Sequence, residues 1–261
     1  MKNLLIRENI MTNQELLLEI KRLKKENLEL KGVEKKISEP KAYYFSQITD
    51  IQLEKLVDIE QIYNQDIFKK WFLFNYEING EDINFLKELI NKNAPFIFNY
   101  LEEDLKIYFI APLINKVDFF MVENKVRGFF ESNLIYETEN FIFTGDVDFM
   151  VSSGIKRPKT PYFFIQEFKK GKKPKDPEPQ LLAEMISAVE LNKSKKMKGA
   201  FIIGKDWYFV ILEKLGVDKY QYFISQNFDS TRIEDLKNIY KNLQFIKNEV
   251  IEIVKNKKSS R

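Results

Sequence analysis

The sequence predicts an α/β protein in which helices flank a mixed β-sheet. The spacing of hydrophobic residues is mainly helical before residue 115, and after about Arg127 it changes to the alternation that is typical of strands. A helical pattern then returns between two groups of strands, as in α/β folds. With 261 residues and 44% hydrophobic side chains, the chain has enough apolar material for a large buried core.

The composition restricts the chemistry that the chain can perform. It has no cysteine and no histidine, which excludes disulfides, thiolate nucleophiles, imidazole bases and zinc sites built from these side chains. Hydrolysis would therefore depend on carboxylates, lysine, tyrosine or a metal bound by oxygen ligands. The 42 basic and 39 acidic residues give a net charge of only +3, so a nucleic acid would have to be bound by local basic clusters.

Membrane and export signals are not found in the sequence. No apolar run reaches the ~18 to 20 residues of a membrane span. The start has only three consecutive apolar residues, Leu4 to Ile6, whereas a secretory signal needs about 7 to 15. We expect a soluble, cytoplasmic protein with no membrane partner.

The first predicted domain, residues 1–36, carries a heptad pattern. The seam residues alternate at intervals of four and three: Leu16, Ile20, Leu23, Asn27 and Leu30. This pattern predicts a short coiled coil over residues 13–31 and, with Asn27 at an a position, a parallel homodimer. A single solvated helix is the alternative. Residues 37–44 are the predicted linker because Ser38-Glu39-Pro40 is unfavourable for helix.

Residues 45–100 are predicted to form an acidic helical subdomain. Residues 45 to 105 contain twelve acidic side chains and five lysines, a balance that disfavours binding of a polyanion there. The apolar spacing is helical and is interrupted at Asn79-Gly80 and Ala94-Pro95. A further helix is expected from Leu101 to Asn115.

The sheet belongs to a predicted domain of residues 101–225. The expected elements are strands at 129–138, 141–151 and 161–169, a helix at 177–192, and short strands at 199–204 and 207–213. Residues 226–261 form the last predicted region. It contains a helix over 233–254 and a basic tail.

Charged side chains at the ends of two apolar strands are the candidate catalytic residues. Glu167 and Lys169 are two residues apart, so strand geometry places both on one face. Asp148 lies at the end of the preceding apolar run, and Asp146 is its rival because both share a face. Two carboxylates from adjacent strands can bind one divalent cation, and a nearby lysine can orient or deprotonate the water that attacks a phosphodiester.

These residues, taken in order and spacing, resemble the PD-(D/E)XK nuclease superfamily. The resemblance covers roughly residues 100–225 and rests on Gly145-Asp146-Val147-Asp148, on the strand Phe164-Ile165-Gln166-Glu167-Phe168-Lys169, and on the helix opening Gln180-Leu181-Leu182-Ala183-Glu184. The segment that begins at Glu102 is similar to the first core helix, whose acidic residue, Glu102 or else Glu103, can complete a metal site. Val147 replaces the proline of the first motif and leaves the choice between the two aspartates open.

The resemblance implies a restriction-endonuclease-like fold and a Mg²⁺- or Mn²⁺-dependent endonuclease that acts on DNA. It implies that Asp148 and Glu167 bind the metal, with Glu102 as a further ligand. It also implies that Lys169 positions the attacking water and that Gln180 helps to orient the site. A role in defence against foreign DNA or in repair would suit this family.

Basic side chains cluster near the same motifs. Residues 156–175 contain eight basic residues and one acid, Glu167. The predicted nucleic-acid-binding residues are Lys156, Arg157, Lys170, Lys172, Lys173 and Lys175. A phosphate backbone would be attracted to them, although lysines in loops also serve solubility alone.

Each of these interpretations has an alternative. The chain as a whole can be read as a catalytically silent nuclease fold that binds nucleic acid or assembles through its coiled coil. Glu167 and Lys169 can be read as an exposed cross-strand ion pair. Gln180 and Glu184 can be read as ordinary solvated positions at a helix start, and for Glu184 this is our interpretation.

Overall fold

The computed structural model describes residues 22–23, 26, 39–169 and 176–259. The chain divides into two units, residues 1–39 and residues 40–261. Most of the predicted coiled coil over 13–31 lies outside the described residues, and its pairing stays a prediction. Within the second unit, the last four residues of the expected linker form a strand, Lys41–Tyr44.

The second unit is built around one mixed sheet, which contains nine strands among the described residues. The strands are β1 (Lys41–Tyr44), β2 (Asp58–Gln61), β3 (Val126–Glu137), β4 (Phe141–Ser153), β5 (Lys159–Lys169), β6 (Lys196–Ile203), β7 (Asp206–Gly216), β8 (Lys219–Ile224) and β9 (Phe228–Asp229). Their order is β1-β4-β5-β6-β7-β8-β2, with β3 paired to β4 and β9 to β7. β4 is antiparallel to both β3 and β5, whereas β5 and β6 are parallel. The predicted α/β class with a mixed sheet is confirmed.

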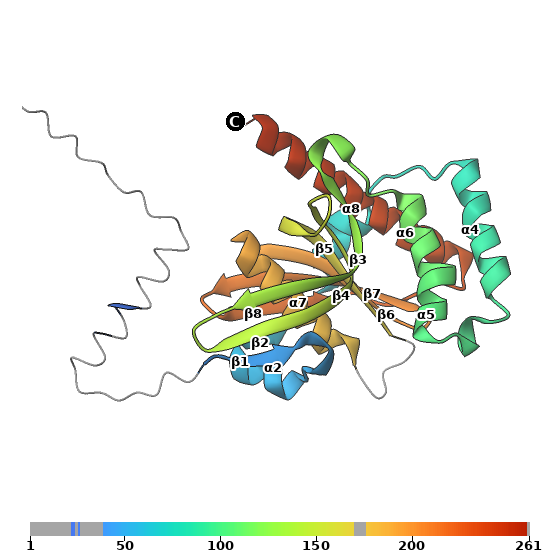
Figure 1. Cartoon of the computed structure of the whole chain (residues 1–261). Coiled ribbons are helices and arrows are strands. Elements are labelled where there is room, and N and C mark those ends of the chain that lie inside the picture. Colours follow the sequence, from blue (N-terminus) through green and yellow to red (C-terminus); the bar gives the residue numbers. More distant parts are fainter. Residues whose placement is uncertain (1–21, 24–25, 27–38, 170–175, 260–261) are drawn as a thin grey trace, which may run out of the picture. The chain divides into compact units, whose positions relative to one another are not determined.

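Helices cover both faces of the sheet (Figure 1). They are α2 (Asp50–Leu56), α3 (Lys69–Phe72), α4 (Gly80–Asn93), α5 (Glu102–Leu105), α6 (Ala111–Val117), α7 (Pro177–Asn192) and α8 (Ile233–Ser259), with short 3-10 turns at Phe45–Gln47, Gln65–Phe68, Ile97–Asn99 and Val122–Asn124. α7 packs on β5 and β6, while α4 and α6 pack against α8 over the other face. No described helix is both long and apolar enough to cross a membrane.

The helix α7 begins and ends where its sequence predicts. Asp176 caps it by accepting the backbone N–H of Glu178 at 3.1 Å, and Pro177 follows at the first helical position. The chain leaves the helix at Lys193, which has a positive φ of 53°. Between these ends nearly every side chain is buried, because α7 lies under the sheet and beside α2.

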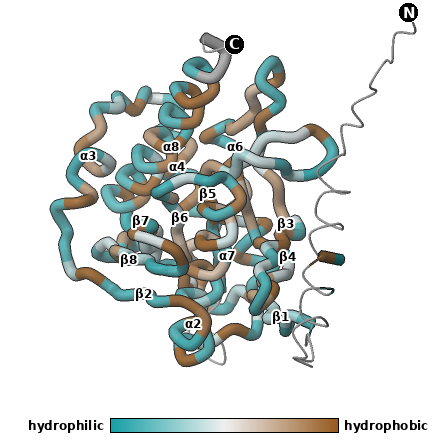
Figure 2. Tube along the Cα trace, turned by 90° about the vertical axis from the view of Figure 1, so that its left-hand side faces the viewer, coloured by the Kyte–Doolittle hydropathy of each residue, from teal (hydrophilic) through white to brown (hydrophobic). Residues whose placement is uncertain are grey.

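The acidic region, residues 45–100, shares the sheet and the core of the unit. It contains α2, α3 and α4, as expected, but also β2, which pairs in parallel with β8. Trp71 of α3 is buried and donates its indole N–H to the Asn242 carbonyl of α8 at 2.9 Å. Figure 2 shows hydrophobic and hydrophilic segments alternating along the chain, including its outer helices. Apolar side chains from this region therefore complete the core over one face of the sheet.

Candidate active site

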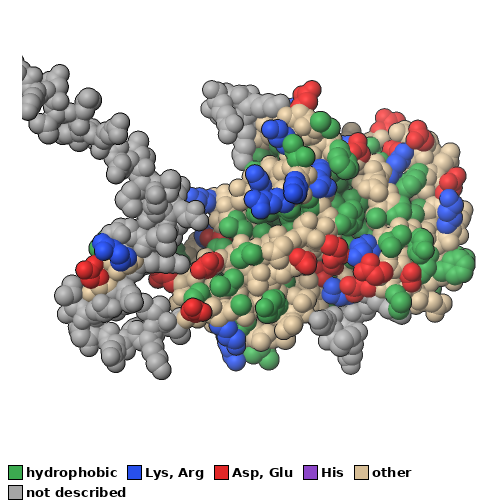
Figure 3. All heavy atoms as spheres, viewed as in Figure 1, with side chains coloured by type: hydrophobic (Ala, Val, Ile, Leu, Met, Phe, Trp, Pro, Cys, Tyr) green, Lys and Arg blue, Asp and Glu red, His purple; other side chains and the backbone are tan. Residues whose placement is uncertain are grey.

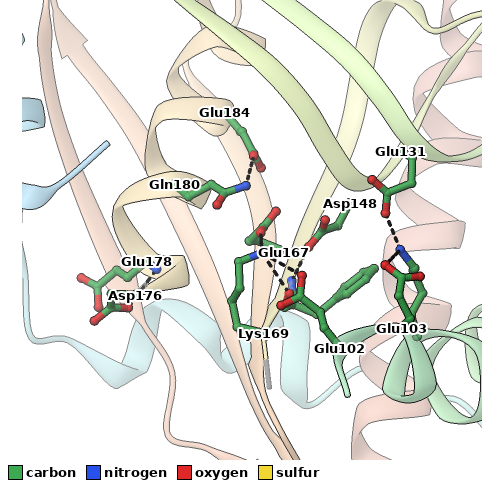
Figure 4. A network of polar contacts seen from close by, with 12 residues as sticks. Glu102, Glu103, Glu131, Asp148, Glu167, Lys169, Asp176, Glu178, Gln180 and Glu184 are labelled. Carbon is green, nitrogen blue, oxygen red and sulfur yellow. Dashed lines mark hydrogen bonds and ion pairs between the residues drawn. The ribbon is translucent and has the colours of Figure 1, made fainter. Parts of the chain in front are cut away.

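Four charged side chains from three elements meet at one end of β5 (Figure 4). The Lys169 Nζ atom lies 2.5 Å from Glu167 Oε1, 3.6 Å from Asp148 Oδ2 and 3.3 Å from Glu102 Oε1. Glu167 and Lys169 come from β5, Asp148 comes from β4, and Glu102 is the first residue of α5. The structure thus brings together the three residues expected from the strands and the acid expected from the first core helix.

Strand geometry explains how β5 presents its two charged residues. Glu167 and Lys169 lie on one face of β5, and Phe168 between them is buried in the core on the other face. The backbone N–H of Phe168 donates to Asp148 Oδ2 at 2.9 Å. That hydrogen bond ties β4 to β5 beside the cluster. Glu167 is 0% exposed and Asp148 is 8% exposed, so the interpretation of an exposed cross-strand pair is wrong.

The structure distinguishes between the two candidate aspartates and between the two candidate glutamates by their contacts with Lys169. Asp146 is exposed, and its Oδ1 accepts a hydrogen bond from Asn133 across the strand pair at 3.3 Å. Asp148, not Asp146, contacts Lys169. Likewise Glu102 contacts Lys169, whereas the next residue, Glu103, binds a different lysine of the same helical stretch.

Burial and neighbouring charges shift the protonation of the cluster. Burial raises the pKa of Glu167 well above its usual range, and the charges of Glu184 and Asp148 add to this effect, which Lys169 partly offsets. Burial acts to lower the pKa of Lys169, but the carboxylates of Glu167 and Asp148 raise it further, so the net shift is upward. Lys169 is therefore a permanent cation at neutral pH, held in place by the acids around it.

Gln180 and Glu184 lie one turn apart on the buried side of α7. They are 4% and 0% exposed, and the Gln180 Nε2 atom donates to Glu184 Oε1 at 3.2 Å. The interpretation of both as solvated positions is therefore wrong, because α7 is enclosed by the sheet and by α2. Burial and the charge of Asp148 raise the pKa of Glu184 well above its usual range.

Glu184 is the residue of this region that sequence reasoning missed. Its charge raises the pKa of Glu167, and its Oε2 atom, like Oε2 of Glu167, is buried without a hydrogen-bond partner in the structure. Helical periodicity gave no signal for it, because α7 is buried on nearly all sides. A buried glutamate is costly unless the structure uses it. Gln180 acts on this glutamate directly.

The carboxylate groups of the cluster are of the chemical kind that binds a hard divalent cation. Carboxylate oxygens are the ligands that Mg²⁺ prefers, and two of the oxygens are buried and unpartnered. Among the described residues, however, no group of three or more acidic side chains is arranged to hold a metal ion. The cation that contacts Glu102, Asp148 and Glu167 is the Lys169 ammonium group. Metal binding stays a prediction.

The two predicted nucleic-acid-binding residues that the structure describes, Lys156 and Arg157, precede β5, whereas Glu167 and Lys169 lie at its other end. Lys156 and Arg157 are exposed in the connection between β4 and β5. Lys159 begins β5, and the eight-residue step from there to Glu167 corresponds to about 26 Å at the usual rise of a strand. Residues 170–175, which hold the other four lysines, lie outside the described residues. On the face drawn in Figure 3, several basic side chains gather near the upper middle, and acidic side chains with basic ones among them lie below and to the right of these.

Comparison with protein-family models and with curated proteins finds no match to this chain. The function has therefore to be inferred from the fold and from the cluster itself.

Proposed function

We propose that the chain is a metal-dependent nuclease that hydrolyses phosphodiester bonds of DNA and has a restriction-endonuclease-like fold. The observation that carries the proposal is the convergence of Asp148, Glu167, Lys169 and Glu102 where the end of β5 lies beside the middle of β4. The element order supports it as well, since a helical stretch precedes three antiparallel strands, a helix and a strand parallel to the third. This is the order that the family resemblance implies.

Each residue has a defined role in the proposed reaction. Asp148 and Glu167 would hold Mg²⁺ or Mn²⁺, with Glu102 as a further ligand, and the bound ion would supply an activated water and stabilise the charge that develops on the phosphate. Lys169 is kept protonated and oriented by the acids, so its ammonium group can position the attacking water and stabilise that charge. Gln180 orients Glu184, whose charge acts on Glu167.

A second function is favoured by one specific observation. Lys169 contacts three carboxylates, and no three acids of the described ranges are arranged around a cation position. In a catalytically silent nuclease fold, the lysine and the carboxylates of the site would neutralise one another's charges in this way. It would bind nucleic acid or assemble through residues 13–31 in a cytoplasmic homodimer.

The test is cleavage of supercoiled plasmid DNA by the full-length protein with Mg²⁺, Mn²⁺, Ca²⁺ or a chelator. We expect cleavage with Mg²⁺ or Mn²⁺ only. Asp148→Asn should reduce the rate by about a hundredfold or more, the typical loss when a key electrostatic group is removed. Asp146→Asn is the matched control, because the same change is made two residues away on an exposed side chain.

Thermal unfolding of both variants shows that a loss of rate is not a loss of fold. Cleavage that survives the chelator, or that is equal in Asp148→Asn and the wild type, would refute the proposed function. Binding of DNA without cleavage under any of these metals would favour the silent module.

A further inference from the structure

One residue of β3 has a backbone conformation that is unusual inside a strand. Glu131 has a positive φ of 45°, the left-handed region that glycine and asparagine tolerate and glutamate rarely adopts. The other non-glycine residues of the described ranges with positive φ are Asp118, Lys125, Lys193 and Asp218; they lie at the ends of helical segments or in the β7–β8 turn.

This residue lies opposite Asp148. β3 and β4 keep the same register on both sides of it, with Phe130 paired to Phe149 and Ser132 paired to Val147. No residue is inserted, so the distortion is local to the Glu131 position. The strained backbone therefore lies directly across the strand pair from a residue of the proposed site.

A second irregularity occurs in the helical stretch that carries Glu102. The segment Lys106–Ile110 between α5 and α6 is a π-helix, a rare conformation that is often found at functional sites. The backbone N–H of Lys106 donates to the carbonyl oxygens of Glu102 and Glu103. The side chain that starts the π-helical segment is thus one turn away from Glu102.

An ion pair joins the two irregularities. The Lys106 Nζ atom lies 2.6 Å from Glu131 Oε1 and 2.9 Å from Glu103 Oε1. It also lies 5.9 Å from the centre of the Phe168 ring, and Phe168 separates Glu167 from Lys169 in β5. The Lys106 side chain is only 13% exposed, and that of Glu131 is 50% exposed.

We propose that the Lys106–Glu131 ion pair positions Glu102 against Lys169, so that Lys106 and Glu131 are positioning residues of the proposed nuclease site. The helix α5 is the first turn of a helical stretch that continues through the π-helical segment into α6, and the orientation of such a terminal turn depends on the contacts that its own residues make. Leu105 anchors it in the core, and Lys106 fixes its rotation by binding β3. The Glu102 side chain is 40% exposed, so little else holds it at Lys169.

A surface ion pair without a function does not account for the conformation of Glu131. Exposed pairs add little stability, whereas a non-glycine residue in the left-handed region costs free energy and persists only where its surroundings demand it. Glycine or asparagine would be the easier choice for the backbone. Neither of them has a carboxylate that could bind Lys106.

The direct test is a comparison of crystal structures of the wild type and Glu131→Gln, which does not depend on activity. We expect the uncharged amide of the variant to bind Lys106 more weakly and, as a result, Glu102 Oε1 to move out of hydrogen-bond distance of Lys169 Nζ. A Glu102–Lys169 contact that stays at 3.3 Å after the pair is broken would overturn the inference, even if the wild type proves to be an active nuclease. If the wild type proves inactive, the proposed function fails and this comparison still decides the positioning role.

Kinetics provide the second test, which rests on the proposed function. Glu131→Gln and Lys106→Met should each lower kcat by about tenfold to a hundredfold, the effect of a misplaced group, with KM unchanged. Lys106→Arg keeps the ion pair and should retain most of the activity, and the double variant should be no slower than either single variant. Glu81→Gln is the control, because it removes a contact of the same kind, at 3.0 Å, from Lys116 of α6. Equal losses in the control, or independent losses in the double variant, would contradict a shared positioning role.

Discussion

Replacement of Glu184 by glutamine should change how the stability of the protein depends on pH. Glu184 is 0% exposed, and its carboxylate has one hydrogen-bond partner, Gln180. Burial and the charge of Asp148 raise its pKa well above the usual value of 4.5. Because the folded state holds this proton more tightly than the unfolded state, the free energy of unfolding falls as the pH rises from about 4.5 to the pKa of the folded state. Glutamine keeps the shape of the side chain and cannot ionise.

The size of this change in the free energy of unfolding follows from the linkage between proton binding and folding. While the folded state is protonated and the unfolded state is ionised, each pH unit costs about 1.4 kcal/mol of stability. From pH 5 to pH 7 the advantage of Glu184→Gln over the wild type should therefore grow by up to about 2.7 kcal/mol. For a unit of this size about 1 kcal/mol corresponds to roughly 2 to 4 °C, so the difference in Tm should widen by up to about 5 to 11 °C.

The assay is thermal unfolding of the wild type and Glu184→Gln at half-unit steps from pH 5 to pH 8. Glu88→Gln is the control, because it makes the same change on an exposed position of the helix α4. The control should follow the wild type at every pH. If the curves of Tm against pH for Glu184→Gln and the wild type run parallel, burial does not raise the pKa of Glu184, and the reasoning is refuted.

Two further predictions concern other parts of the chain. Burial acts to raise the pKa of Asp229, but hydrogen bonds from Lys205 and Thr231 lower it below the usual 3.8. The ionised carboxylate therefore stabilises the fold above about pH 4, and this stabilisation is lost as the pH falls through the lowered pKa. Asp229→Asn should therefore cost about 1 to 3 kcal/mol in urea unfolding at pH 7, and much less at pH 3; an equal cost at both values would contradict this origin. Deletion of residues 1–36 should convert a weak dimer into a monomer in light scattering at tens of micromolar, and it should reduce double-strand breaks more than nicking. A full-length protein that is monomeric at that concentration would rule out the predicted seam.

The elements that the sequence predicts well are long and strongly periodic. β4, β5 and α7 follow their expected ranges because their hydrophobic spacing is set by burial against a continuous core. β1 and β2 were missed because each has four residues, most of them exposed or half-exposed, at the margins of the sheet. Such short strands are defined by the strand that they pair with, and the sequence does not show that partner.

The residues of the candidate site also divide into those that the sequence predicts and those that it does not. Glu167 and Lys169 are recognisable because charges interrupt an apolar strand, and Asp148 is recognisable because it interrupts another, β4. The burial of Glu184 was not predictable from the sequence. The helix α7 is enclosed on nearly all sides, so helical periodicity does not distinguish a buried face from a solvated one. The contact between Lys106 and Glu131 was not predictable either, since a π-helical segment and a strained residue in a strand have no clear sequence signal.

Several departures from ordinary local structure coincide at the proposed site. Among the described residues, the buried carboxylate oxygens without a hydrogen-bond partner are Oε2 of Glu167 and Oε2 of Glu184. The π-helical segment begins one turn after Glu102, and the strained residue of β3 lies opposite Asp148. These features belong to four different elements, and stability alone would remove each of them. Proteins keep such departures mainly where function requires them, so their convergence supports a functional site at this location without reference to the family resemblance.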